Sequence, residues 1–256
     1  LYSDGDIEEQ MLKMAKEGVT CEELSSEQVS FPVIYHFSDL RANILNWYPI
    51  KKSDSVLEIG AGCGAITGTL CEKAGQVTSV ELSKRRAQIN YYRNEKKDNL
   101  TIMVGNLNDM NLGQQYDYVV VNGVLEYAMS FTEGDTPYET FLGKMGSYLK
   151  NTGKLLIAIE NKLGMKYFAG APEDHTDIPF FGINGYPENH SVRTFSKTEL
   201  QELVKKSGFP FQKFYYPYPD YKFPTEIFTD ASLTTNHYGK NYPIYTDKTV
   251  DLFSES

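Results

Sequence analysis

The chain has 256 residues, with 25 Lys and Arg against 34 Asp and Glu, a formal charge of −9 and a pI near 5.0. Phosphates bind clustered Lys and Arg, so this charge balance disfavours nucleic acid as a partner. No apolar run reaches the length of a membrane span, and three cysteines without metal-ligand spacing indicate reduced thiols in a cytoplasmic protein. Because the sequence starts at Leu1 rather than Met, we expect a fragment of a longer polypeptide.

The first 50 residues predict a helical extension at the edge of the main fold. They are also the acidic part of the chain. Residues 1–30 hold eight acids and two bases, so they carry a net charge of −6 out of the total of −9. Asp6 is placed to cap a helix over 7–17, and Gly18 is placed to end it. A second helix is expected over 38–48, where apolar residues have helical spacing before Pro49.

From residue 51 to 160, short apolar strands alternate with helices. Ser83, Thr136 and Ser196 each precede a helical pattern as capping residues. Regular alternation of this kind predicts an α/β fold with a doubly wound, mainly parallel sheet. The expected strands are 55–59, 76–80, 100–104, 116–121 and 154–159.

Beyond the fifth strand the periodicity is lost. Residues 161–195 are expected to form a lid or substrate loop, since loops of this length are often functional. Residues 196–256 are interpreted as the C-terminal part of the same domain, cut short before a final antiparallel strand. Nine of the 20 residues in 209–228 are Tyr or Phe. This aromatic segment suits packing in a strand or hairpin, stacking on a sugar ring, or docking another chain.

A glycine-rich loop follows the first strand. Gly60, Gly62 and Gly64 let the backbone turn tightly and approach a ligand without side chains in the way. With Ala65 in the last place, the loop also satisfies the G-x-G-x-x-[GA] pattern of dinucleotide-binding proteins. An NAD(P)-dependent oxidoreductase is therefore one interpretation.

Two acids favour another cofactor. Glu81 ends the second strand 21 residues after Gly60, where a carboxylate can accept both hydroxyls of a ribose. Glu58 lies at the tip of the first strand, just before the loop. A carboxylate there repels a pyrophosphate and attracts the ammonium and sulfonium of S-adenosyl-L-methionine.

With the acid before G-x-G-x-G and the second-strand acid, the sequence resembles the class I S-adenosylmethionine-dependent methyltransferases over residues 51–160. The resemblance implies a Rossmann-like fold, transferase activity and S-adenosyl-L-methionine as cofactor. Asn106 stands where the family often has Asp beside the adenine, and Asn122 follows the fourth strand where cofactor and acceptor meet. The implied cofactor-binding residues are Glu58, Gly60, Ala61, Gly62, Gly64, Glu81, Leu82, Asn106, Leu107, Asn122 and Gly123.

Residues 160–230 look like methyltransferase domains found with glycosyltransferases in bacterial polysaccharide biosynthesis. This likeness implies O-methylation of a sugar, a glycan precursor or a small polar metabolite, and a glycosyltransferase as partner or fused domain. His175 and His190 are candidate bases for a hydroxyl acceptor. No metal is assigned, although Asp174, His175 and Asp177 are candidate ligands. A non-catalytic module that docks a glycosyltransferase is a further alternative.

Overall fold

The computed structural model describes residues 5–25, 30–187 and 190–233, and it divides the chain into two compact units. One unit combines Leu1–Asn122 with Met145–Ile157 and Lys222–Pro224. The other combines Gly123–Lys144 with Ala158–Tyr221 and Thr225–Ser256. Among the described residues, no helix has the length and apolar character needed to cross a bilayer.

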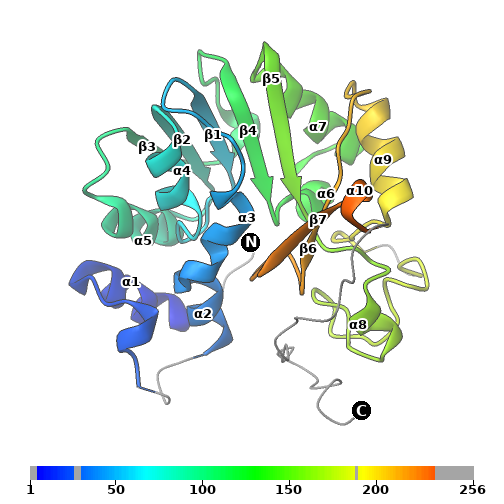
Figure 1. Cartoon of the computed structure of the whole chain (residues 1–256), viewed down its shortest axis with the longest axis horizontal. Helices are drawn as coiled ribbons and strands as arrows, with labels where there is room; N and C mark the ends of the chain where they lie inside the picture. Colours follow the sequence, from blue (N-terminus) through cyan, green and yellow to red (C-terminus); the bar gives the residue numbers. More distant parts are fainter. Residues whose placement is uncertain (1–4, 26–29, 188–189, 234–256) are drawn as a thin grey trace. The chain divides into compact units, whose positions relative to one another are not determined.

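A five-stranded sheet with the order β3-β2-β1-β4-β5 forms the centre of the first unit, and its labelled strands run in the same direction in Figure 1. The parallel register aligns Glu58 of β1 with Ser79 of β2 and Val120 of β4. This arrangement confirms the predicted Rossmann-like parallel sheet. The strands are β1 (Ser55–Ile59), β2 (Gln76–Glu81), β3 (Leu100–Val104), β4 (Tyr116–Asn122) and β5 (Leu149–Ala158).

The inner strands are buried because their apolar residues face helices on both sides of the sheet. Val56, Leu57 and Val77 are fully buried in β1 and β2. Helix α4 (Thr67–Lys73) packs its Leu70 and Cys71 into the same apolar cluster. The bounds predicted for β1 and β3 are confirmed, and β2 and β4 each extend one residue further. β5 begins five residues before its predicted start and ends one residue before its predicted end, because the polar residues 150–154 of its first half give no strand pattern.

The predicted N-terminal helix over 7–17 is confirmed as α1 (Ile7–Glu17), and Gly18 ends it in the left-handed conformation. The predicted cap is wrong, because the Asp6 side chain makes no capping hydrogen bond. Helix α1 packs on α5 (Lys84–Asn94) through Met11, Leu12, Met14 and Ala15. A buried ion pair joins the same helices, with Arg86 Nε 2.9 Å from Glu8 Oε1.

The helix predicted over 38–48 is wrong in its bounds. The chain instead forms α2 (Phe31–Phe37), a 3₁₀ turn η2 (Asp39–Ala42) and α3 (Asn43–Asn46). Ser38 separates them, because its backbone is extended and its Oγ accepts a hydrogen bond from the Leu40 N–H. The prediction began at Ser38, so it left out α2 and joined η2 and α3 into one helix.

Helix α9 (Lys197–Lys206) in the second unit begins after the predicted capping residue Ser196, which forms a capping box with Glu199. Ser196 Oγ and the Glu199 carboxylate exchange hydrogen bonds with each other's backbone N–H. The aromatic segment contains an antiparallel pair of strands, β6 (Tyr215–Tyr218) and β7 (Glu226–Thr229). The final strand considered for 229–256 falls largely in 234–256, outside the described residues.

Shorter elements complete the two units. The described residues of the segment 161–195, predicted as a lid or substrate loop, contain one short helix among turns, and the segment's role as a lid stays a prediction. The boundaries predicted at 50, 160 and 195 also stay predictions. The short elements are η1 (Cys21–Glu23), η3 (Leu107–Asp109), η4 (Leu125–Tyr127), α6 (Ala128–Phe131), α8 (Met165–Phe168) and α10 (Asp230–Leu233), beside the longer α7 (Pro137–Ser147).

Candidate functional site

The glycine loop leaves β1 at the carboxyl end of the parallel sheet. Gly60, Gly62 and Gly64 all have positive φ, at 66°, 55° and 79°. The Gly60 and Ala61 N–H groups both donate to Val80 O, which ties the start of the loop to β2. A Cβ on Gly64 would clash with the buried Asn90 side chain. The glycines are therefore required by the backbone conformation and, at Gly64, also by packing.

Glu58 lies beneath this loop and is 2% exposed. Its Oε2 accepts hydrogen bonds from Thr67 Oγ1 at 2.7 Å and Ser79 Oγ at 2.5 Å. Burial raises the pKa of Glu58 to about 7, and the charge of Glu81 adds to the rise against those two hydrogen bonds. Within the described residues, Glu58 Oε1 has no hydrogen-bond partner. Direct contact of Glu58 with a cofactor stays a prediction.

Asn122 ends β4, the strand that neighbours β1. Its Oδ1 atom is also buried without a hydrogen-bond partner in the part of the chain that the structure describes. The register pairs Ile59 with Val121, so β1 and β4 end side by side. Two acceptor oxygens, on Glu58 and Asn122, thus lie near the same edge of the sheet, and a buried acceptor gains most from a cationic donor.

Glu81 holds the glycine loop in place, a contact that the sequence did not predict. Its Oε2 accepts the Gly62 N–H at 2.8 Å, and its Oε1 accepts the Ser83 N–H at 2.7 Å. The carboxylate therefore holds the glycine loop against the start of α5. A carboxylate offers about four lone-pair sites, so these two bonds leave capacity for ribose hydroxyls. The predicted ribose contact remains a prediction.

The remaining predicted cofactor residues follow the strands β2, β3 and β4 in the sequence. Leu82, 37% exposed, follows β2, and the buried Leu107 follows β3 in η3. The Asn106 side chain is turned back, since its Oδ1 accepts the Asn108 N–H at 2.9 Å. Gly123 begins the second unit, and its N–H donates to Ala158 O. The residues of the first unit thus present a glycine loop, a carboxylate and an apolar side chain at one sheet edge, a set that fits an adenosyl cofactor with a cationic tail.

Comparisons with known proteins agree with this geometry. Residues 57–155 match a family described as a methyltransferase domain. The chain is 19% identical to DhpI, solved as a DhpI–SAM–HEP complex, with a TM-score of 0.51 over 81% of this chain and 91% of that one. A SAM-dependent methyltransferase of Thermotoga maritima, possible histamine N-methyltransferase, is 21% identical with a TM-score of 0.50 over 76% and 82%. The fold is that of a Rossmann-like methyltransferase.

Two curated relatives match a smaller part of the chain than these solved structures do. The malonyl-[acyl-carrier protein] O-methyltransferase of Priestia megaterium is 26% identical over 163 residues, which are 63% of this chain and 48% of the relative. Ribosomal RNA small subunit methyltransferase A of Wigglesworthia glossinidia brevipalpis is 24% identical over 52% of this chain and 49% of its own length. The chain thus spans about half the length of these relatives.

The two histidines lie in different surroundings within the second unit. His175 is largely buried, and its Nδ1 lies 2.9 Å from Glu173 Oε1. Burial lowers the pKa of His175, but the hydrogen bond to Glu173 and the charges of Glu160 and Glu126 outweigh it, so the pKa is raised. The ring of His190 instead packs edge-on against Phe181, with centroids 4.7 Å apart.

The structure changes the set of residues that could hold a metal ion. The Asp174 carboxylate accepts hydrogen bonds from Lys166 Nζ and from the Tyr167 hydroxyl, both at 2.9 Å. Asp177 is exposed. Buried Glu126 and Glu160 approach His175 instead. Sequence reasoning missed both glutamates because they lie far from His175 along the chain. Glu160 lies two residues after the end of β5, and an acid shortly after a predicted strand is the signal that could have found it.

Arg41 lies in η2, before the first strand, and its charge is buried. It is 2% exposed, its Nη1 donates to Lys222 O at 2.9 Å, and its guanidinium lies over Tyr35 at 4.3 Å. The Arg41 guanidinium is therefore packed against an aromatic ring inside the first unit.

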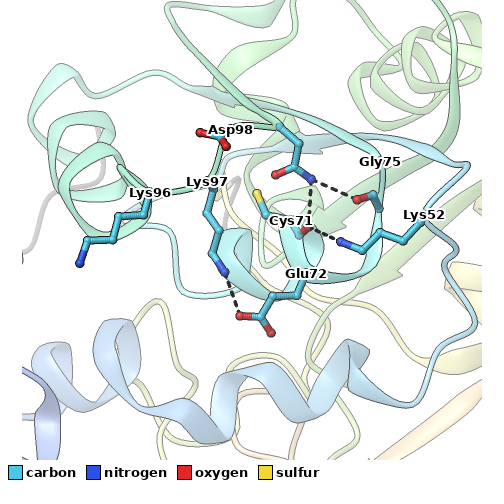
Figure 2. A pocket seen from close by; sticks show the side chains of 9 residues that line it. Lys52, Cys71, Glu72, Gly75, Lys96, Lys97 and Asp98 are labelled. Carbon is cyan, nitrogen blue, oxygen red and sulfur yellow. Dashed lines mark hydrogen bonds and ion pairs between the residues drawn. The ribbon is translucent and has the colours of Figure 1, made fainter.

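A depression of about 470 Å³ lies at the opposite edge of the sheet, and Figure 2 shows the side chains around it. Lys52, Gly75 and Asn99 line it from the segments that lead into β1, β2 and β3. Asn99 Nδ2 binds the carbonyls at the end of α4, and Lys97 pairs with Glu72. These contacts are internal, and the depression is separate from the glycine loop.

Proposed function

We propose that the protein is an S-adenosyl-L-methionine-dependent methyltransferase whose cofactor binds along the carboxyl edge of the first unit. One observation supports this most: a three-glycine loop with positive φ is held by Glu81 and is accompanied by two buried acceptors, Glu58 Oε1 and Asn122 Oδ1. A pyrophosphate has no donor for such acceptors, whereas an ammonium has three. The methyltransferase match over 57–155 also favours this function over the oxidoreductase alternative.

The proposed acceptor is a hydroxyl of a sugar, a glycan precursor or a small polar metabolite. The D/N-P-P-[YF] pattern of amine methylases is absent, because Gly123 and Val124 follow Asn122. A relative named as an O-methyltransferase is in line with an oxygen acceptor. The aromatic segment 209–228 offers flat rings that suit a sugar face. Polysaccharide biosynthesis, with a glycosyltransferase as partner, belongs to the same proposal.

Methyl transfer from a sulfonium is an in-line displacement, which the protein accelerates mainly by aligning the reacting atoms away from water. A hydroxyl acceptor must also lose its proton to a positioned base. His175 is largely buried and its Nδ1 is held by Glu173, so its ring is already part of an internal hydrogen bond. We therefore retain His190 as the stronger of the two candidate bases. A His190→Gln variant should keep cofactor affinity and lose turnover.

A methyl-transfer assay tests the proposal. The full chain is incubated with S-adenosyl-L-methionine carrying a labelled methyl group and, in separate arms, a metabolite extract, a polysaccharide precursor fraction or ribosomal RNA. We expect label in a small polar or glycan product, lost in Glu81→Ala and kept in Glu72→Ala, an acid at the opposite sheet edge. Label in RNA alone would overturn the acceptor class. Cofactor binding without label in any arm would favour the non-catalytic module.

A further inference from the structure

We propose that Glu126, Glu160 and His175 form a binding site for one divalent transition-metal ion in the second unit. The residues come from three separate segments: η4, the end of β5 and the turn after α8. One ligand atom from each lies within 4.8 Å of the other two. The inference concerns a site of its own and does not rest on the proposed methyl transfer.

The spacing of the three atoms suits a bound ion after a small contraction. His175 Nε2 lies 3.9 Å from Glu126 Oε1. A tetrahedral ion with bonds of about 2.0–2.1 Å holds its ligand atoms about 3.3 Å apart. A bound ion would therefore draw these two atoms slightly closer together.

Burial gives the second argument. Glu126 is 1% exposed and Glu160 is 7% exposed, so both carboxylates have lost most of their water. Buried charges are paired or coordinate metals, because an isolated buried ion is costly. Together with Glu173, these residues set three carboxylates around one imidazole. A protonated imidazole offsets a single negative charge, whereas a divalent ion offsets two.

The imidazole is oriented as metal-binding histidines usually are. Glu173 is 2% exposed, and its Oε1 lies 2.9 Å from His175 Nδ1. The hydroxyl of Tyr186 donates to the same oxygen at 3.2 Å, and the other Glu173 oxygen accepts the Thr176 N–H. This carboxylate fixes the tautomer with the proton on Nδ1, which leaves the Nε2 lone pair directed to Glu126 and able to bind a metal.

The ligand set selects the class of ion. Imidazole nitrogen suits zinc, iron and nickel, whereas carboxylate oxygens suit manganese and magnesium. One nitrogen with two carboxylates favours Zn²⁺ or Mn²⁺ over Mg²⁺, which prefers oxygen and retained water. Open coordination positions remain beyond these three ligands.

Metal analysis of the full chain tests the site. The protein is stripped with EDTA, loaded with Zn²⁺, Mn²⁺ or Mg²⁺, desalted and analysed by plasma mass spectrometry. We expect about one Zn²⁺ or Mn²⁺ per chain in the wild type and at least about a tenfold loss of affinity in Glu160→Gln. Asp177→Asn is the control, because Asp177 is exposed and lies two residues from His175. This variant should bind the metal ion as the wild type does.

Thermal unfolding of the same samples separates a metal site from a purely structural cluster. The ion should raise the melting temperature of the wild type and leave Glu160→Gln unchanged. Without metal, Glu160→Gln should melt at or above the wild type, because it removes one of the crowded carboxylates. No retained ion in the folded wild type, equal retention in Glu160→Gln, or a preference for Mg²⁺ would each overturn the proposal.

Discussion

Replacing Glu58 by Gln should change how stability depends on pH. The Glu58 carboxyl is buried beneath the glycine loop, and its pKa is raised to about 7 from 4.5, mainly by burial. The folded protein therefore binds this proton more tightly than the unfolded chain does. The resulting stabilisation is complete below about pH 4.5 and is lost as the pH rises through about 7. Gln resembles the protonated acid and does not titrate.

The size of the effect follows from the pKa. One pKa unit corresponds to about 1.4 kcal/mol, so the full rise is worth about 3 kcal/mol. About 2.5 kcal/mol of this falls between pH 5 and pH 8. The difference in unfolding free energy, wild type minus Glu58→Gln, should fall by that amount across this range, because all other titrating groups are common to both proteins.

Urea unfolding of the cofactor-free proteins at several pH values measures this difference. Glu72→Gln is the matched control, since its side chain is 69% exposed in the pair with Lys97. For the control, the difference from the wild type should vary little with pH. A difference between wild type and Glu58→Gln that is flat from pH 5 to pH 8 would refute the reasoning from burial.

Two further predictions concern the glycine loop and helix α9. Gly64→Ala should destabilise the fold by about 1–3 kcal/mol more than Gly113→Ala in urea unfolding, because both positions have positive φ but only Gly64 faces Asn90; equal losses would contradict the clash. Ser196→Ala should cost about 1 kcal/mol, since Ser196 caps α9, whereas the exposed Thr198→Ala should cost little; equal costs would show that the cap contributes nothing.

The sheet could be predicted from the sequence because its strands are short apolar runs with clear ends. Ser55 to Ile59 is followed directly by the glycine loop, and both bounds of β1 are as predicted. The start of α9 was also predicted from the sequence, because Ser196 and Glu199 have the spacing of a capping pair. In these places the local pattern and the fold agree, so short-range rules are sufficient.

The bounds of the helices over 31–46 were not predicted correctly, because a short-range hydrogen bond of Ser38 divides that stretch. Ser38, predicted as the start of one helix, has an extended backbone, and its hydroxyl accepts the Leu40 N–H at the start of a 3₁₀ turn. The aromatic segment was left open between three uses. Part of it forms the β6–β7 pair, and Phe223 packs edge-on against Phe31 and Tyr35.

The site was predicted in outline, and its internal contacts were not. The loop, Glu58 and Glu81 follow from position along the strands. The loop-holding bonds of Glu81 and the hydrogen bonds to Glu58 depend on neighbouring strands, which a single sequence does not place in register. The approach of Glu126 and Glu160 to His175 depends on three distant segments and was missed for the same reason.

Calorimetric titration of the full chain with S-adenosyl-L-methionine tests the central claim most directly. We expect one binding site per chain, about tenfold to hundredfold weaker in Glu81→Ala, since a charged acceptor is lost, and unchanged in Glu72→Ala. Binding of NADH in place of S-adenosyl-L-methionine, or no difference between the two variants, would contradict the assignment of the cofactor to the carboxyl edge of the sheet.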